Sequence, residues 1–73
     1  MSAERDVEKN VPVAQFVDTL RRLADALEAG DSFRVQVQNR RLTVPADATI
    51  VIEHEVEGGN EEFAMELQWQ ARG

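Results

Sequence analysis

The apolar residues of this chain change their spacing once, after Gly30, and that change divides the sequence into a helical part and a strand-forming part. From Val13 they recur every three or four residues, which predicts an amphipathic helix over about 12–29. Pro12 suits the first turn of such a helix, and Gly30 suits the position just after its end. From Phe33 onward apolar and polar residues alternate, which is typical of strands with one buried face.

The first alternating segment predicts a β-hairpin. We expect its loop at Asn39–Arg40, because asparagine tolerates the positive φ that a two-residue loop requires. This register gives one apolar face with the cross-strand pairs Val37–Leu42 and Val35–Val44. Pro45, Ala46 and Asp47 then break the alternation and form a connection.

The second alternating segment predicts a longer hairpin with a tight turn at Gly59–Asn60, a dipeptide that favours such turns. A shift by one residue would turn one apolar row to water, so the pattern specifies which side chains share a face. The expected cross-strand pairs are Val56–Phe63, His54–Met65, Ile52–Leu67 and Ile50–Trp69. We expect Trp69 to close the core against the helix, near Val13–Phe16 or Leu27, although an exposed aromatic anchor is the alternative.

These elements predict an α+β fold of two layers. One amphipathic helix packs on one face of a four- to five-strand, mainly antiparallel sheet, in the order β-α-β-β-β-β. The first strand of that order is a short edge strand over Glu4–Lys9, with Val7 turned inward. Seventy-three residues allow a single domain. The only helix covers the inner face of the sheet, so the outer face meets solvent or a partner.

The final hairpin resembles the amphi-Trp domain family of archaea and bacteria. That family is marked by a C-terminal pair of strands that alternate hydrophobic and acidic residues and finish near a tryptophan. Here the strands are Ile50-Val51-Ile52-Glu53-His54-Glu55-Val56-Glu57 and Glu62-Phe63-Ala64-Met65-Glu66-Leu67-Gln68-Trp69. The helix segment over 17–30 is also similar to the family's helix. The resemblance implies one amphi-Trp-like domain over 1–73, with a core of about 4–70, and it carries no activity.

The formal charge of −6 belongs entirely to the last third of the chain. Residues 1–46 hold seven acidic and seven basic side chains, whereas 47–73 hold seven acidic residues and only Arg72. The expected register places Glu53 opposite Glu66 and Glu57 opposite Glu62, on the outer face. The candidate interaction face comprises Glu53, Glu55, Glu57, Glu62, Glu66, Arg34 and Arg41. This face would attract a basic partner or cations. The simpler interpretation is that its charge only keeps the protein soluble and prevents aggregation.

Several classes of function are disfavoured by composition. The acidic balance, with a sequence pI of 4.6, has the wrong sign for nucleic-acid binding, and no apolar run is long enough to predict a membrane segment. The absence of cysteine removes disulfides, thiol nucleophiles and Cys-ligated metals. Carboxylates on a flat, wet strand surface lack the cleft that acid–base catalysis needs. His54 has no second histidine for a metal site, so we expect it to be packed, with a pH switch as the alternative hypothesis.

The sequence therefore predicts a small, acidic, cytoplasmic and non-enzymatic domain with no cofactor or metal. Its expected role is a protein-interaction or accessory module that uses the acidic sheet face to bind an unidentified protein partner, and the charge of that face favours a basic one. Two alternatives stay open at this point. One is a homo-oligomeric structural unit joined through a sheet face or edge, and the other is a weak cation or small-ligand binder. No nucleic-acid or membrane partner is expected.

Overall fold

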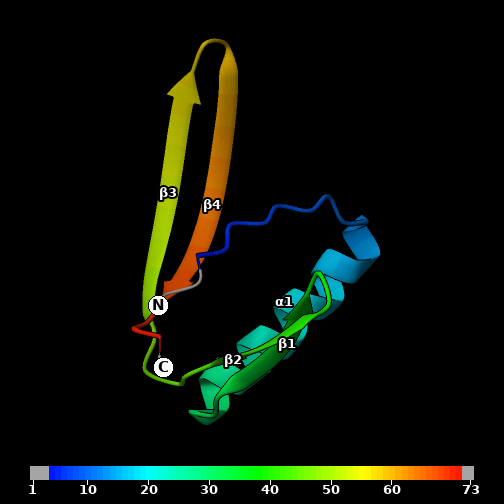
Figure 1. Cartoon of the computed structure of the whole chain (residues 1–73), viewed down its shortest axis with the longest axis vertical. Coiled ribbons are helices and arrows are strands. Elements are labelled where there is room, and N and C mark those ends of the chain that lie inside the picture. Colours follow the sequence, from blue (N-terminus) through cyan, green and yellow to red (C-terminus); the bar gives the residue numbers. More distant parts are fainter. Residues whose placement is uncertain (1–3, 72–73) are drawn as a thin grey trace.

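The structure, a computed structural model, describes residues 4–71 and contains one helix and two hairpins (Figure 1). The elements follow in the order α1 (Val13–Ala29), β1 (Phe33–Val37), β2 (Arg40–Val44), β3 (Thr49–Glu57) and β4 (Asn60–Gln68). Both strand pairs are antiparallel. The predicted α+β class is confirmed.

Helix α1 begins and ends where the sequence predicts. Pro12 occupies the N-cap position with an extended backbone, and its carbonyl accepts a hydrogen bond from Phe16 N at 3.0 Å. At the other end Gly30 adopts the left-handed conformation with φ 72°. Its N–H reaches Leu27 O at 3.2 Å, and Asp31 N–H reaches Ala26 O at 2.9 Å. These two bonds satisfy carbonyls of the last turn that would otherwise lack partners.

The β1–β2 hairpin turns at Gln38–Asn39, so the loop predicted at Asn39–Arg40 is wrong by one residue. Gln38 and Asn39 have φ of 48° and 64°, the pair of positive values that a type I′ turn needs. The observed pairs are Phe33–Val44, Val35–Leu42 and Val37–Arg40. Compared with the prediction, the register slides by two residues, which keeps each side chain on its expected face.

The β3–β4 hairpin shows the same displacement. Its turn is Gly58–Gly59, with φ of 56° and 84°, and Asn60 already belongs to β4. Two glycines adopt these angles without the steric penalty that a Cβ would bring. The pairs on one face are Ile50–Leu67, Ile52–Met65, His54–Phe63 and Val56–Glu61, so the four pairs predicted there are wrong.

The four strands form two separate two-stranded sheets in the part of the chain that the structure describes. The single sheet of four to five strands is therefore not confirmed. The predicted strand over Glu4–Lys9 is not formed either, because residues 4–12 carry no strand or helix. That segment is held to the tip of the first hairpin instead, where Arg5 Nη2 donates to Val37 O at 2.6 Å. Val7 is exposed rather than turned inward.

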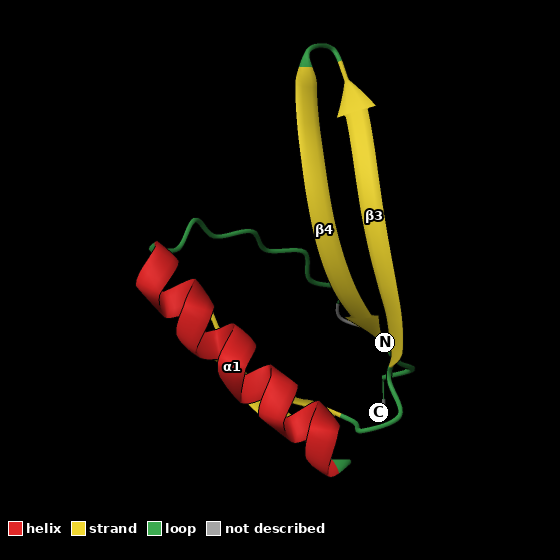
Figure 2. Cartoon of the chain, turned by 180° about the vertical axis from the view of Figure 1, so that it is seen from behind, coloured by secondary structure: helices red, strands yellow, loops and turns green. Residues whose placement is uncertain are grey.

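The core is small and lies in the β1–β2 hairpin. Phe33 and Val44, which face each other across the strands, are only 8% and 7% exposed. Helix α1 packs along β1, where the Arg22 guanidinium lies 5.4 Å from the centre of the Phe33 ring and donates to Arg34 O at 3.1 Å. The β3–β4 hairpin projects away from this helix-and-hairpin body as an arm, as the view from behind also shows (Figure 2).

Candidate interaction site

The projecting β3–β4 arm carries two chemically different faces, since successive side chains of a strand point to opposite sides. We call one the acidic face; it comprises Glu53, Glu55, Glu57, Glu62 and Glu66. We call the other the apolar face; it comprises Ile50, Ile52, His54, Val56, Glu61, Phe63, Met65 and Leu67. The predicted gathering of the five glutamates on one face is confirmed by the register.

The neighbours within the acidic face differ from those predicted. Glu55 lies directly opposite Glu62, whereas the predicted opposition of Glu53 to Glu66 and of Glu57 to Glu62 is wrong. Like charges directly opposed destabilise a two-stranded sheet modestly. All members of the face are exposed except Glu66, which is half-buried.

Glu53 and Glu66 interact although they are not direct cross-strand partners. A side-chain hydrogen bond to Glu66, followed by repulsion from the same carboxylate, raises the pKa of Glu53 above its ordinary value of 4.5. Glu66 is also approached by the Gln68 amide, whose Nε2 donates to Glu66 Oε1 at 3.1 Å. The shared hydrogen bond comes first among the causes of the raised pKa of Glu53, and repulsion from Glu66, Glu55 and Glu62 adds to it.

The two arginines that the sequence assigned to the same face lie elsewhere. Arg34 and Arg41 belong to the β1–β2 sheet, which is separate from the sheet of the glutamates. Within residues 4–71 neither arginine forms a salt bridge with a glutamate of the acidic face, so neither neutralises it by direct contact.

The apolar face is largely uncovered. Ile52 and Phe63 are 66% and 67% exposed, and the structure shows α1 packed on β1 rather than on this arm.

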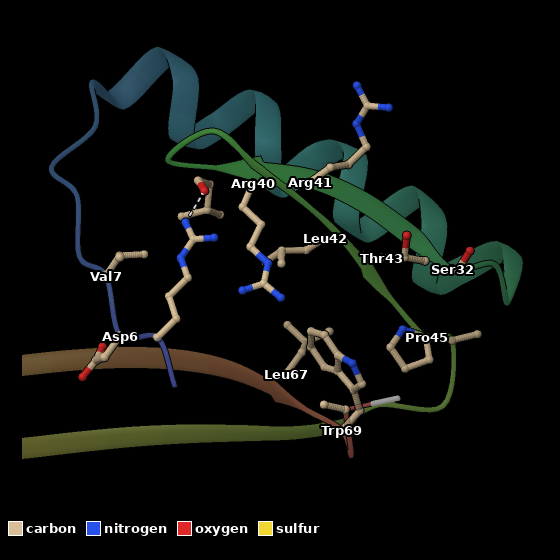
Figure 3. Close-up of a pocket in the computed structure, with 14 residues that line it drawn as sticks. Asp6, Val7, Ser32, Arg40, Arg41, Leu42, Thr43, Pro45, Leu67 and Trp69 are labelled. Carbon is tan, nitrogen blue, oxygen red and sulfur yellow. Dashed lines mark hydrogen bonds between the residues drawn. The ribbon is translucent and has the colours of Figure 1, made fainter. Parts of the chain in front are cut away.

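Trp69, beyond the end of β4, is 40% exposed; beside Leu67 it points toward the β1–β2 hairpin (Figure 3). The prediction that Trp69 closes a core against α1 is therefore wrong.

His54 is not packed as predicted. Its side chain is 59% exposed, and its Nε2 lies 2.7 Å from Glu61 Oε2. A neutral ring with a proton on Nε2 donates this hydrogen bond, and a protonated ring converts it into an ion pair. The pH switch at His54 stays a hypothesis.

A groove of about 1030 Å³ separates the base of the arm from β2. Arg40 and Leu42 point into it from β2, Leu67 and Trp69 enter from the arm, and Arg41 points away (Figure 3). Sequence reasoning missed this groove, because only the arrangement of the two hairpins creates it. Its described lining residues include no histidine or cysteine, so it does not bring a nucleophile together with an imidazole base.

Over residues 4–71, no cluster of three or more His, Cys, Asp or Glu side chains has a geometry that could hold a metal ion. The described helix is too short and too polar to cross a membrane.

Comparison with family models, with curated proteins and with solved structures gives no match to this chain. The resemblance to the amphi-Trp family therefore stays a prediction.

Proposed function

We propose that this chain is a non-enzymatic, cytoplasmic protein-interaction module whose acidic face binds a basic segment of a partner protein. The observation that supports the proposal most is the placement of five glutamates on one face of an arm that stands away from the body. No lysine or arginine of the described chain forms an ion pair with them.

The electrostatics of the face favour a cationic partner. A hydrogen bond to Glu66 and, after it, repulsion from the neighbouring carboxylates raise the pKa of Glu53. A row of lysine or arginine side chains would replace repulsion by attraction, and it would be steered from roughly 8 Å away at physiological ionic strength. An extended basic segment fits because residues on one face of a strand repeat every second position.

Cation binding, one of the alternatives left open by the sequence, has less support. The glutamates of the acidic face do not form a metal-holding cluster of three among the residues that the structure describes. Catalysis by the glutamates is also poorly supported, because exposed carboxylates on a hairpin lack the desolvated cleft that displaces catalytic pKa values.

The test uses a synthetic peptide in which lysine alternates with serine, with its dissociation constant measured by calorimetry. The first variant combines Glu55→Gln, Glu57→Gln and Glu62→Gln on the acidic face. A matched variant combines Asp18→Asn, Asp25→Asn and Glu28→Gln on α1. Both variants change the net charge from −6 to −3, so only the position of the lost charge differs.

We expect the acidic-face variant to bind the peptide about tenfold more weakly, since three exposed ion pairs contribute roughly 0.5 kcal/mol each. The helix variant should bind within about twofold of the unaltered chain, because its lost charges lie outside the binding face. Equal weakening in both variants would show that the peptide senses net charge alone, and the proposal would be wrong.

A further inference from the structure

The chain exposes much more surface than a compact monomer of its mass. Its accessible surface is 6735 Å², whereas a folded monomer of 8.2 kDa is expected to expose about 4,500 Å². The excess is about 2,200 Å². The radius of gyration agrees, since it is 13.9 Å against about 11 Å for a compact domain of this length.

About a quarter of the excess is the apolar face of the arm. Its five most exposed large side chains together present roughly 600 Å², taking about 200 Å² for a fully exposed one; they are Ile50, Ile52, Val56, Phe63 and Met65. The largest contiguous apolar patch of a typical soluble monomer is about 300–600 Å² and often marks an interaction site, so the apolar face lies at the upper end of that range. A two-stranded hairpin without a covering layer is also marginally stable in water.

We propose that the apolar face of the arm is covered by the same face of a second copy of this chain, related by a two-fold axis. Two such faces would bury roughly 1,200 Å² of apolar side-chain area, and their rim adds polar area to that. The total reaches the 1,200–2,000 Å² that is typical of specific protein–protein interfaces. Two stacked sheets about 10 Å apart would then form a shared core.

The charges of the apolar face permit this self-association. It holds one histidine and one glutamate, and these two already pair with each other at 2.7 Å within the chain. The face therefore brings at most one net negative charge per copy to the interface, whereas the acidic face carries five glutamates. The acidic faces would point outward on both sides of the stacked arms, so the interface and the proposed binding of a basic segment use different residues and can fail independently.

The solution mass of the unaltered chain is the first test. Sedimentation equilibrium should give twice the 8.2 kDa of the chain, with dissociation on dilution. Ile52→Glu should weaken the dimer at least about 100-fold, because it buries a carboxylate without a partner. Ile52 is 66% exposed in the single chain, so this change leaves the monomer's own packing almost untouched. The matched control is Glu53→Gln, the next residue on the acidic face, and it should leave dimerisation unchanged or slightly stronger.

Cross-linking tests which face is buried, and the absence of cysteine from the chain makes this direct. Ile52 and its cross-strand partner Met65 lie near the middle of the apolar face, so a two-fold axis through that face brings each close to its own copy. A bis-maleimide cross-linker that spans about 10 Å, the separation of stacked sheets, should therefore link Ile52→Cys chains rapidly into covalent dimers, and Glu53→Cys chains slowly.

Three results would overturn the proposal. One is a monomer at every concentration, which would mean that the arm is covered within its own chain or not at all. Another is a dimer that Ile52→Glu leaves intact. The last is faster cross-linking at position 53 than at position 52, which would place the contact on the acidic face.

Discussion

Replacement of Phe33 by alanine is the most severe test of the observed core. Phe33 is 8% exposed, so about nine-tenths of its roughly 200 Å² is removed from water by folding. At about 25 cal/mol per Å² this burial corresponds to about 4–5 kcal/mol as an upper value. The lost contact with the Arg22 guanidinium, 5.4 Å from the ring centre, adds about 0.5–1 kcal/mol. The whole chain is expected to have a free energy of unfolding of only about 4–11 kcal/mol.

Phe33→Ala should therefore remove a large share of the stability, and α1 should lose helicity because its packing surface on β1 is gone. Urea unfolding followed by far-ultraviolet circular dichroism measures both effects. Phe33→Leu provides the graded control, with an expected loss of about 1–1.5 kcal/mol and a midpoint lowered by about 1 M. A loss below about 1 kcal/mol for Phe33→Ala would refute the placement of the core at this residue.

Three further changes give smaller effects with definite signs. Glu53→Gln should stabilise the chain at neutral pH but not below pH 4.5. The raised pKa of Glu53 means that the fold favours the protonated carboxyl, so stability is lost as the pH rises through the folded-state pKa. Urea midpoints of both chains, measured below pH 4.5 and at neutral pH, test this change. Gly30→Ala should cost about 1 kcal/mol in thermal unfolding, since φ of 72° is unfavourable for alanine although no atom lies near its Cβ. Gln38→Gly should raise the free energy of unfolding by at most about 0.5 kcal/mol in urea unfolding, because relief of φ 48° is partly offset by the lost hydrogen bond from Gln38 Nε2 to Glu8 O at 3.4 Å.

The helix could be predicted closely because several independent signals agree on it. The apolar spacing, Pro12 in the first turn and Gly30 just after the last one predict a helix over about 12–29, and the structure differs only in placing Pro12 at the N-cap. The division of the second hairpin into an apolar and an acidic face was also predictable, because the alternation of side chains has a period of two.

The cross-strand registers could not be read from alternation alone. A slide by two residues returns each side chain to the same face, so the pattern is equally satisfied by turns at Gly58–Gly59 and at Gly59–Asn60. The choice depends on backbone conformation. Two successive residues need positive φ, and a pair of glycines meets this need better than glycine followed by asparagine. The turn of the first hairpin was predicted one residue too late for the same reason, since alternation allows both Gln38–Asn39 and Asn39–Arg40.

The arrangement of the two hairpins relative to each other could not be predicted from the sequence. An apolar row shows that a strand has a face to cover, but it does not specify the covering element. For Phe33 and Val44 that element lies within the chain, whereas Ile52 and Phe63 remain uncovered on the arm. The predicted position of Arg34 and Arg41 was wrong because it assumed one continuous sheet, in which both arginines would lie beside the glutamates.

The separation of the arm from the helix is tested most directly by nuclear Overhauser effects between side chains. A sample that mixes labelled and unlabelled chains distinguishes contacts within one chain from contacts between chains. The Phe33 ring should show contacts with Arg22 of its own α1, and the Phe63 ring should show none with the α1 of its own chain. Contacts of Phe63 with its own α1, together with backbone contacts that join β2 to β3 or β4, would contradict the two-sheet arrangement and the uncovered apolar face.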